Sequence, residues 1–214
     1  MSSPSTVPLS HAMGSGSADA HRTAEGTRFV TALLDGRVSG EGYGAYLLRL
    51  RVVYDALESL VRARRSHPTV AAVWDPALER LPALDADLGY WLPGCAPSVE
   101  DSPAAAAYAS RLHAVASRPH LLVAHHYTRY LGDLAGGQVI GRTLEERYAL
   151  DGHGLAFYDF PGVGRPVPYR RAYKDRVDAL PLSVVEQREV VDEVVLAFGL
   201  NRDLLEELAS QPAR

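Results

Sequence analysis

Apolar residues recur every three or four positions along almost the whole of this 214-residue chain, and this spacing constrains its fold more than any other feature. Strand signals are almost absent, because no alternating apolar run is joined to another by an Asn-Gly or Asp-Gly turn. The pattern therefore predicts a single all-α domain of roughly seven or eight helices. It is clearest from Ser39 to Arg65, where one helical face would carry Tyr43, Leu47, Leu50, Tyr54, Leu57 and Val61.

Residues that favour helix starts stand at matching places along the chain. Ser39 precedes the long periodic stretch and is a plausible N-cap. Asp75 and Ser102 each precede a proline, the residue that favours the first helical position. The stretch Ser183–Glu186 fits a capping box and is followed by apolar residues at helical spacing. These signals strengthen the prediction of helices throughout.

Composition and charge limit the class of protein. Residues 1–17 are rich in Ser, Gly and Pro and are expected to be disordered, which leaves residues 18–210 as one folded domain. A net charge of −4 gives no support for nucleic-acid binding, and the single cysteine, Cys95, excludes a disulfide framework or a Cys-based zinc cluster. No apolar stretch approaches the ~20 residues of a membrane span, and residues 1–20 lack the features of a secretory signal. We expect a cytoplasmic protein without a membrane anchor.

One predicted helix contains several glycines. The periodic pattern continues from Pro119 to Leu150, although each interior glycine costs a helix about 1 kcal/mol relative to alanine. A flat ligand lying against bare backbone, with Asp133 holding polar atoms or water beside it, explains these glycines. A close crossing with a second helix explains the small residues equally well. The positions three or four apart on this face are Arg129, Gly132, Asp133, Gly136 and Ile140.

Two stretches resemble a known family. Residues 127–138, with the sequence YTRYLGDLAGGQ, closely resemble the signature of the heme oxygenases, with Ala135 in place of the family's usual serine. Residues 21–25, with the sequence HRTAE, resemble the proximal helix of the same family. The resemblance extends over residues 18–208, nearly the whole chain.

The resemblance implies a fold and an activity. The fold would be a single-domain, multi-helical one, with heme between a proximal helix and a kinked distal helix. The activity would be oxidative cleavage of heme to biliverdin by O2, with release of CO and ferrous iron, and heme b would be both substrate and prosthetic group. No flavin or iron–sulfur motif is visible, so an external ferredoxin or NAD(P)H-dependent reductase is expected to supply electrons. The family resemblance also suggests a monomer.

Eight histidines compete for the role of heme-iron ligand. The resemblance selects His21 as the axial ligand and places Glu25 one turn later as its partner. From helical spacing its main rival is His125, which lies one turn before Arg129 on the glycine-bearing face. We interpret His125 as a core histidine hydrogen-bonded within the distal helix, and His126 as its less constrained neighbour.

On the distal side, the resemblance implies that the helix kinks over the heme at its glycines. Asp133 is expected to order the water that assists oxygen activation. The other residues that the resemblance places at this wall are Tyr54, Arg129, Gly132, Gly136 and Gly137.

The heme propionates require cations at the edge of the site. Arg170 and Lys174 are four residues apart on one helical face and match the cations that bind propionates in the family. A solvated basic face is the more common explanation for such a run when no resemblance is considered. Tyr127 matches a family tyrosine that reaches a propionate. Gly14 and Ala18 stand where the family has lysines, so anchoring of the propionates would depend more heavily on Arg170 and Lys174.

Two other functions fit parts of the pattern. A heme-binding carrier or sensor would need the iron ligand but would not need Asp133 and the distal glycines. A helical relative with non-heme chemistry, as in the thiaminase-like branch, would need neither feature. Loss of the heme spectrum on reduction separates an oxygenase from a carrier, and absence of tight heme binding would favour the non-heme relative.

Overall fold

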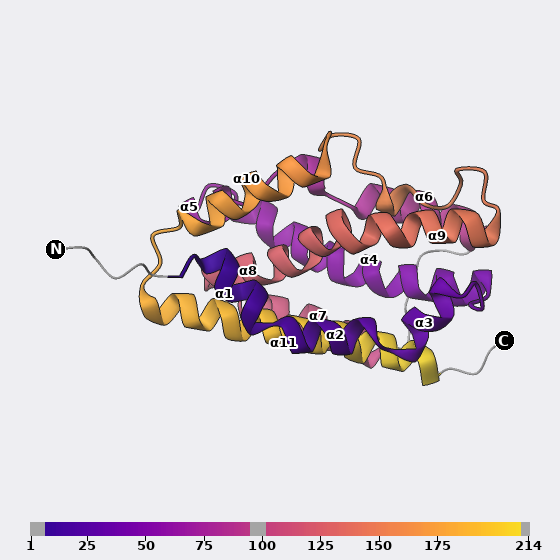
Figure 1. The fold of residues 1–214 in the computed structure, drawn as a ribbon, viewed down its shortest axis with the longest axis horizontal. Coiled ribbons are helices and arrows are strands. Elements are labelled where there is room, and N and C mark those ends of the chain that lie inside the picture. The colour runs from indigo at the N-terminus through magenta and orange to yellow at the C-terminus, as the bar shows by residue number, and fades with distance from the viewer. Residues whose placement is uncertain (1–6, 95–101, 211–214) are drawn as a thin grey trace.

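The structure is a computed structural model that describes residues 7–94 and 102–210. These residues form helices and connecting turns and contain no strand, so the all-α prediction is confirmed (Figure 1). The α-helices are α1 (Leu9–Gly16), α2 (Ala18–Glu25), α3 (Arg28–Leu34), α4 (Gly40–Ala63), α5 (Pro68–Ala71), α6 (Leu81–Trp91), α7 (Pro103–Ala114), α8 (Pro119–His126), α9 (Gln138–Tyr148), α10 (Pro166–Asp178) and α11 (Val184–Ser210). The shorter elements are the 3₁₀ turns η1 (Pro76–Leu78) and η4 (Ala156–Tyr158) and the π-helical segments η2 (Tyr127–Leu131) and η3 (Asp133–Gly137).

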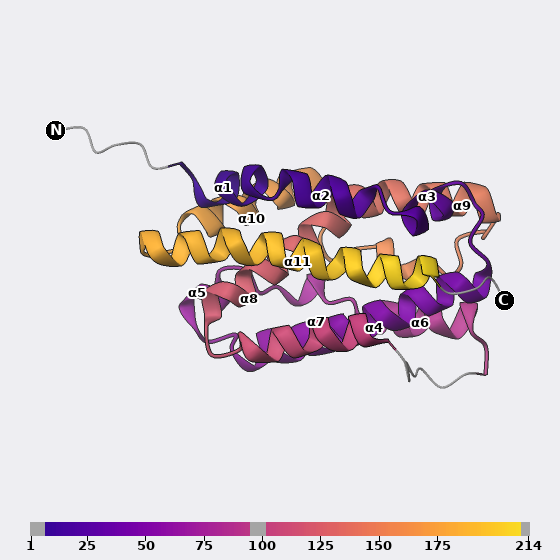
Figure 2. The same ribbon diagram turned by 90° about the horizontal axis from the view of Figure 1, so that it is seen from below.

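Helix α11 lies between the two sides of the molecule. It contacts α1, α2 and α3 on one side, and α4, α7 and α8 on the other. Figure 2 shows this arrangement, with α11 running between the N-terminal helices and the group formed by α4, α6 and α7. The N-terminal helices and the distal helix are therefore positioned by the same long element.

The capping residues act largely as predicted. The Oγ of Ser39 accepts a hydrogen bond from the backbone N–H of Gly42, at the start of α4. Ser102 caps α7 in the same way, and Ser183 exchanges hydrogen bonds with Glu186 in a capping box. Asp75 also accepts a backbone hydrogen bond, but it begins the short 3₁₀ turn η1 instead of an α-helix.

The N-terminal segment differs from the prediction. Helix α1 lies inside residues 1–17, whose composition predicts disorder, so that expectation is corrected for residues 9–16. Leu9 and Met13, one turn apart, are buried in the core. The backbone N–H and the hydroxyl of Ser10 both donate to the carboxylate of Asp178 on α10. These contacts to distant residues order a segment whose own composition does not favour helix; residues 1–6 lie outside the described part.

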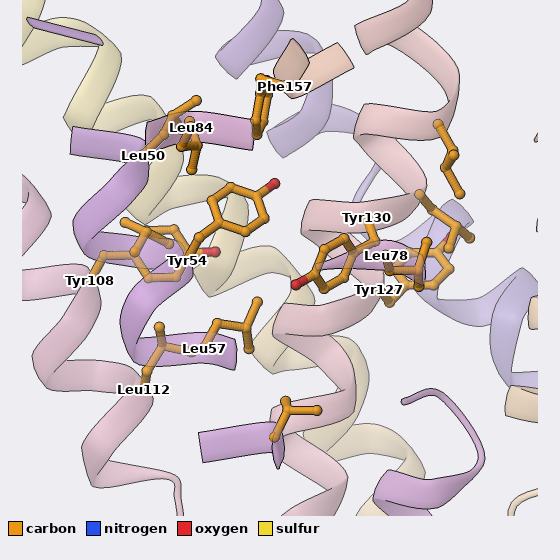
Figure 3. Packing of buried hydrophobic residues seen from close by; sticks show 14 of the residues in the cluster. Leu50, Tyr54, Leu57, Leu78, Leu84, Tyr108, Leu112, Tyr127, Tyr130 and Phe157 are labelled. Atoms are coloured by element: carbon orange, nitrogen blue, oxygen red, sulfur yellow. The ribbon is translucent and has the colours of Figure 1, made fainter. Parts of the chain in front are cut away.

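The predicted apolar face of the long helix α4 is buried. Tyr43, Leu47, Leu50, Tyr54, Leu57 and Val61 are each at most 3% exposed. Figure 3 shows Leu50, Tyr54 and Leu57 among the other packed core residues. Full burial of each such side chain contributes roughly 1.5–3 kcal/mol, so this face fixes the position of α4 in the bundle.

The glycine-bearing helix is continuous from Pro119 to Tyr148 but is not α-helical throughout. Its middle consists of the two π-helical segments η2 and η3, separated by Gly132. Figure 1 shows the chain changing direction between α8 and α9. Since π-helical insertions are a recognised cause of helix bending and cluster at functional sites, they account for this bend. None of the helices in the described part combines the length and apolarity that crossing a bilayer requires.

Candidate active site

A cavity of about 440 Å³ lies between α2, the bent distal helix, α10 and α11. Ten of the eleven site residues expected from the sequence line it: His21, Glu25, Tyr127, Arg129, Gly132, Asp133, Gly136, Gly137, Arg170 and Lys174. The eleventh, Tyr54, is fully buried and touches the cavity wall from behind through Asp133. The fold thus brings together residues that are up to 153 positions apart in the chain.

His21 on α2 forms one wall of the cavity. Its Nδ1 atom lies 3.2 Å from the Oε2 atom of Glu25, and its ring packs edge-on against Phe198 of α11 with the centroids 5.1 Å apart. The imidazole is about half exposed, at 47%, because it faces the cavity. A proton on Nδ1 directed at the Glu25 carboxylate leaves Nε2 with its lone pair free to bind a metal.

The distal glycines divide into two pairs. A Cβ atom added to Gly132 or Gly136 would meet no atom within 4 Å, because both face the open cavity. A Cβ on Gly137 or Gly141 would lie 3.3 or 3.0 Å from Tyr158. The first pair therefore leaves bare backbone for a ligand, while the second allows close packing against the η4 turn. A helix crossing does not account for the first pair.

Asp133 is held by its neighbours on the distal wall. Its Oδ2 atom accepts a short hydrogen bond from the hydroxyl of Tyr54, and its Oδ1 atom lies 3.9 Å from the Arg129 guanidinium. Arg129 in turn donates to the Tyr54 hydroxyl at 3.2 Å and to the Asn201 side chain at 2.6 Å. The carboxylate is thus fixed at the cavity wall by residues from α4 and the distal helix.

Burial changes the acid–base behaviour of this group. It raises the pKa of Asp133, while the Arg129 charge and the Tyr54 hydrogen bond act to lower that pKa. Burial likewise raises the pKa of Tyr54 well above its ordinary value, so the phenol keeps its proton. A raised pKa makes a carboxylate a stronger base, so it takes up and passes on a proton more readily than an ordinary aspartate does.

One edge of the cavity is cationic. Arg170 and Lys174 both line it from α10, and neither forms an ion pair with a carboxylate in the described residues. The Nε atom of Arg170 is buried without a hydrogen-bond partner. Beyond Tyr127 the cleft continues into a second cavity of about 390 Å³, lined by the small residues Gly14 and Ala18 among others. An anionic ligand edge would satisfy these free cations.

Comparison with known proteins decides the family. Residues 7–207 match the family model described as heme oxygenase. The chain belongs to the heme oxygenase family. Heme oxygenase 1 of Rattus norvegicus is 37% identical over 205 residues, covering 94% of this chain and 71% of the rat protein. Heme oxygenase 2 of Synechocystis sp. is 35% identical over 199 residues, covering 90% and 80%.

Solved structures give the same result for the fold. The crystal structure of heme oxygenase-2 from Synechocystis sp. PCC 6803 in complex with heme and NO has a TM-score of 0.90 and 34% sequence identity, covering 94% of this chain and 85% of that one. The structure of heme oxygenase from Leptospira interrogans has a TM-score of 0.90 and 27% identity, covering 94% and 100%. This heme oxygenase is therefore an oxidoreductase that binds heme and degrades it to biliverdin.

The residues of this heme oxygenase fit the group that the family implies. Gly132 and Gly136 provide a flat backbone surface that any larger side chain would fill. Across the cavity, His21 offers one ring nitrogen to a metal, and the orphaned Nε atom of Arg170 marks the anionic edge. A porphyrin with one axial ligand and two carboxylates matches this donor set.

Two other histidines of the distal helix are placed differently from the sequence interpretation. His125 is fully buried as expected, but its Nε2 atom bonds Glu193 of α11 at 2.8 Å, not a group of its own helix. His126 is equally constrained, with its Nδ1 atom 2.8 Å from the Tyr173 hydroxyl. Burial, reinforced by Arg176, lowers the pKa of His126 to about 3, so its ring is neutral. In this heme oxygenase neither ring lines the heme cavity.

Sequence reasoning did not assign several residues that line this site. Tyr46, Phe198 and Asn201 all line the cavity, and Asn201 orients Arg129. Asn201 is a poor helix former in the middle of α11, and this local exception is a signal in the sequence. Tyr46 and Phe198 continue the ordinary apolar pattern, which carries no sign that they face a ligand.

Proposed function

We propose that this heme oxygenase cleaves heme with O2 and electrons from an external donor, releasing CO and ferrous iron together with biliverdin. The observation that carries this proposal is the position of Asp133, fixed by Tyr54 beside the bare backbone of Gly132 and Gly136, in the same cavity as His21. Heme binding alone would need the histidine but not a buried carboxylate in the same cavity wall as two glycines that leave the backbone bare.

In this proposal each wall has a separate task. When bound, heme supplies the iron that reacts with O2 and the porphyrin carbon that is oxidised. His21 holds the iron, and Glu25 fixes the ring tautomer through Nδ1. Arg170 and Lys174 bind the propionates and thereby set the in-plane orientation of the porphyrin.

The distal wall delivers protons. Asp133 orders a water at its carboxylate oxygens and exchanges protons with it, which its raised pKa favours, and Tyr54 and Arg129 keep that carboxylate in one position. Gly132 and Gly136 allow the porphyrin to approach the helix backbone, which restricts where O2 can lie. Tyr127 completes the wall at the propionate edge, and Gly137 completes the wall next to Asp133.

The electron donor is an external ferredoxin or NAD(P)H-dependent reductase. A single cysteine in the chain cannot supply the thiolates of an iron–sulfur cluster, which supports this part of the proposal. We assign the activity to one catalytic domain comprising residues 18–210 and the added helix α1. The cytoplasmic location and the monomeric state expected from the sequence stay predictions.

An absorption time course tests the proposal. Protein loaded with one equivalent of hemin is mixed with ascorbate or a ferredoxin system, and loss of the Soret band with growth of a red biliverdin band is expected. His21→Ala should abolish both the heme spectrum and turnover, while the exposed His113→Ala serves as a matched control. An unchanged heme spectrum despite competent reduction would favour a carrier and refute the proposed turnover.

A further inference from the structure

Aromatic rings in contact lead away from the heme cavity. Tyr54, which bonds Asp133 at the cavity wall, packs edge-on against Tyr130 with the ring centroids 5.6 Å apart. Figure 3 shows these two side chains projecting toward one another from α4 and the distal helix. The Tyr130 ring lies 4.3 Å from that of His126, which stacks on Tyr173 of α10 at 5.7 Å. Contact between rings is thus unbroken from the cavity wall to α10.

The outer end of this series lies near the surface. The guanidinium of Arg176 sits over the rings of both Tyr173 and Tyr169, at 5.6 and 5.8 Å from their centroids. Tyr54, Tyr130 and Tyr173 are at most 2% exposed, whereas Tyr169 is only half-buried. The series therefore begins at the heme cavity and ends where a solute can reach it.

Every tyrosine of the series shares a hydrogen bond with a side chain that can accept its proton. Tyr148, in contrast, donates to a backbone carbonyl, and the buried hydroxyl of Tyr108 has no partner among the described residues. A partner that can take up a proton is thus a feature of these four phenols and not of tyrosines in this chain generally. The four pairs are Tyr54 with Asp133, Tyr130 with Glu58 (3.3 Å), Tyr173 with His126 (2.8 Å) and Tyr169 with Asp75 (2.6 Å).

This pairing is what one-electron oxidation of a buried phenol requires. A phenol that loses an electron becomes a strong acid, and burying its positive charge is costly. A hydrogen-bonded base removes the proton as the electron leaves, so the ring becomes a neutral phenoxyl radical. Even the weakly basic imidazole of His126 accepts a proton from so strong an acid, and a neutral Tyr173 radical is not repelled by Arg176.

We propose that Tyr54, Tyr130, Tyr173 and Tyr169 form a relay that carries oxidising equivalents from the heme cavity to the protein surface. The oxidant is hydrogen peroxide reacting with the heme-loaded enzyme, and the final reductant is ascorbate. Peroxide takes one electron and one proton from each of two phenols, giving two waters and two phenoxyl radicals. Each radical then takes a hydrogen atom from ascorbate, which restores the tyrosine and leaves the ascorbyl radical.

The relay gives the site a second activity, the reduction of peroxide at the expense of a surface donor. It rests on the proposed position of heme in the cavity, since the inner end at Tyr54 contacts the cavity wall through Asp133 and Arg129. Its effect is to move a damaging oxidant from the core to Tyr169, where a small reductant can remove it.

Spin trapping on the heme-loaded full chain tests the relay. Hydrogen peroxide is added in the presence of a nitroso spin trap, and the adducts are located by peptide mass spectrometry. We expect labelling at Tyr169 in the parent and its loss in Tyr173→Phe, with the radical signal retained on the inner tyrosines. Tyr148→Phe, also half-buried but hydrogen-bonded to a carbonyl, should label Tyr169 as the parent does.

Biliverdin formation measured on the same samples reports separately on the proposed oxygenase function and should be unchanged in Tyr173→Phe. Equal labelling of Tyr169 in the parent and in Tyr173→Phe would overturn the relay. Tyr169→Phe removes a half-buried hydroxyl that donates to Asp75 and tests the outer step even if the buried variant fails to fold. It should abolish surface labelling and slow peroxide-driven ascorbate consumption; an unchanged rate would also refute the proposal.

Discussion

Replacing Gly136 by alanine should stabilise the heme-free protein and weaken heme binding. A Cβ atom at this position meets nothing within 4 Å, and the backbone is helical with negative φ. Replacing a glycine at such a compatible site stabilises a protein by about 0.4–1 kcal/mol. For a chain of 214 residues this raises the melting temperature by roughly 1–4 °C.

The same methyl group occupies the surface against which heme is proposed to lie. Forcing one extra methyl into a packed contact costs about 1–3 kcal/mol. We therefore expect Gly136→Ala to bind hemin about 5- to 150-fold more weakly than the parent. Stability and ligand affinity should thus change in opposite directions.

Thermal denaturation of the heme-free protein and titration with hemin at the Soret band measure the two effects. Gly141→Ala is the matched control, because its Cβ would lie 3.0 Å from Tyr158 and should lower the stability of the heme-free protein. A lower melting temperature for Gly136→Ala would mean that the glycine serves helix packing. A higher melting temperature with unchanged heme affinity would mean that heme does not lie on this face, and either result would refute the reasoning.

Three further predictions follow from the site and its surroundings. Asp133→Ala should bind hemin as the parent does but lose biliverdin formation and oxidise guaiacol with peroxide faster; biliverdin at the parent rate would show that the carboxylate has no role. Replacing Arg170 or Lys174 by alanine removes a charge-assisted hydrogen bond of about 1.5–3 kcal/mol, which weakens hemin binding about 10- to 150-fold, and titration with hemin dimethyl ester should show no such difference. Burial raises the pKa of Glu193, but hydrogen bonds from His125 and Arg111 lower it to about 2. Stability from this group is therefore present above its unfolded pKa near 4.5 and is lost as pH falls toward 2, and urea denaturation of Glu193→Gln should lack this component.

Much of the architecture could be predicted from local patterns. The apolar face of α4 follows from residues three and four apart, and its N-cap at Ser39 follows from the chemistry of one hydroxyl. Helix α1 could not be predicted in this way. Its Ser- and Gly-rich sequence has only Leu9 and Met13 to bury, and it is ordered by Asp178, 168 residues away from Ser10.

In the site, too, local sequence features could be predicted and contacts between distant residues could not. The residues of the distal signature could be assigned by resemblance, because they are contiguous in the chain. The partner of His125 could not, since Glu193 lies on a different helix 68 positions away. The resemblance indicates a kinked helix but not its two π-helical segments, because their hydrogen-bond pattern depends on packing around η2 and η3 that no local sequence rule describes.

The π-helical segments also make the distal helix sensitive to its exact length. A π-helical bulge absorbs one additional residue within an otherwise α-helical run. That residue therefore does not add the rotation of about 100° by which each α-helical residue advances the helix. Deleting one residue between Leu131 and Ala135 would let the backbone regain α-helical hydrogen bonds. Because the bulge absorbs that residue, the helix on either side would keep its rotation, so Gly136 would still face the cavity and Gly141 would still face Tyr158. What would be lost is part of the bend that the π-helical segments cause. The exact length of this stretch therefore sets the bend of the distal helix over the cavity, whereas the rotation of its two ends about the helix axis is the same with or without the extra residue.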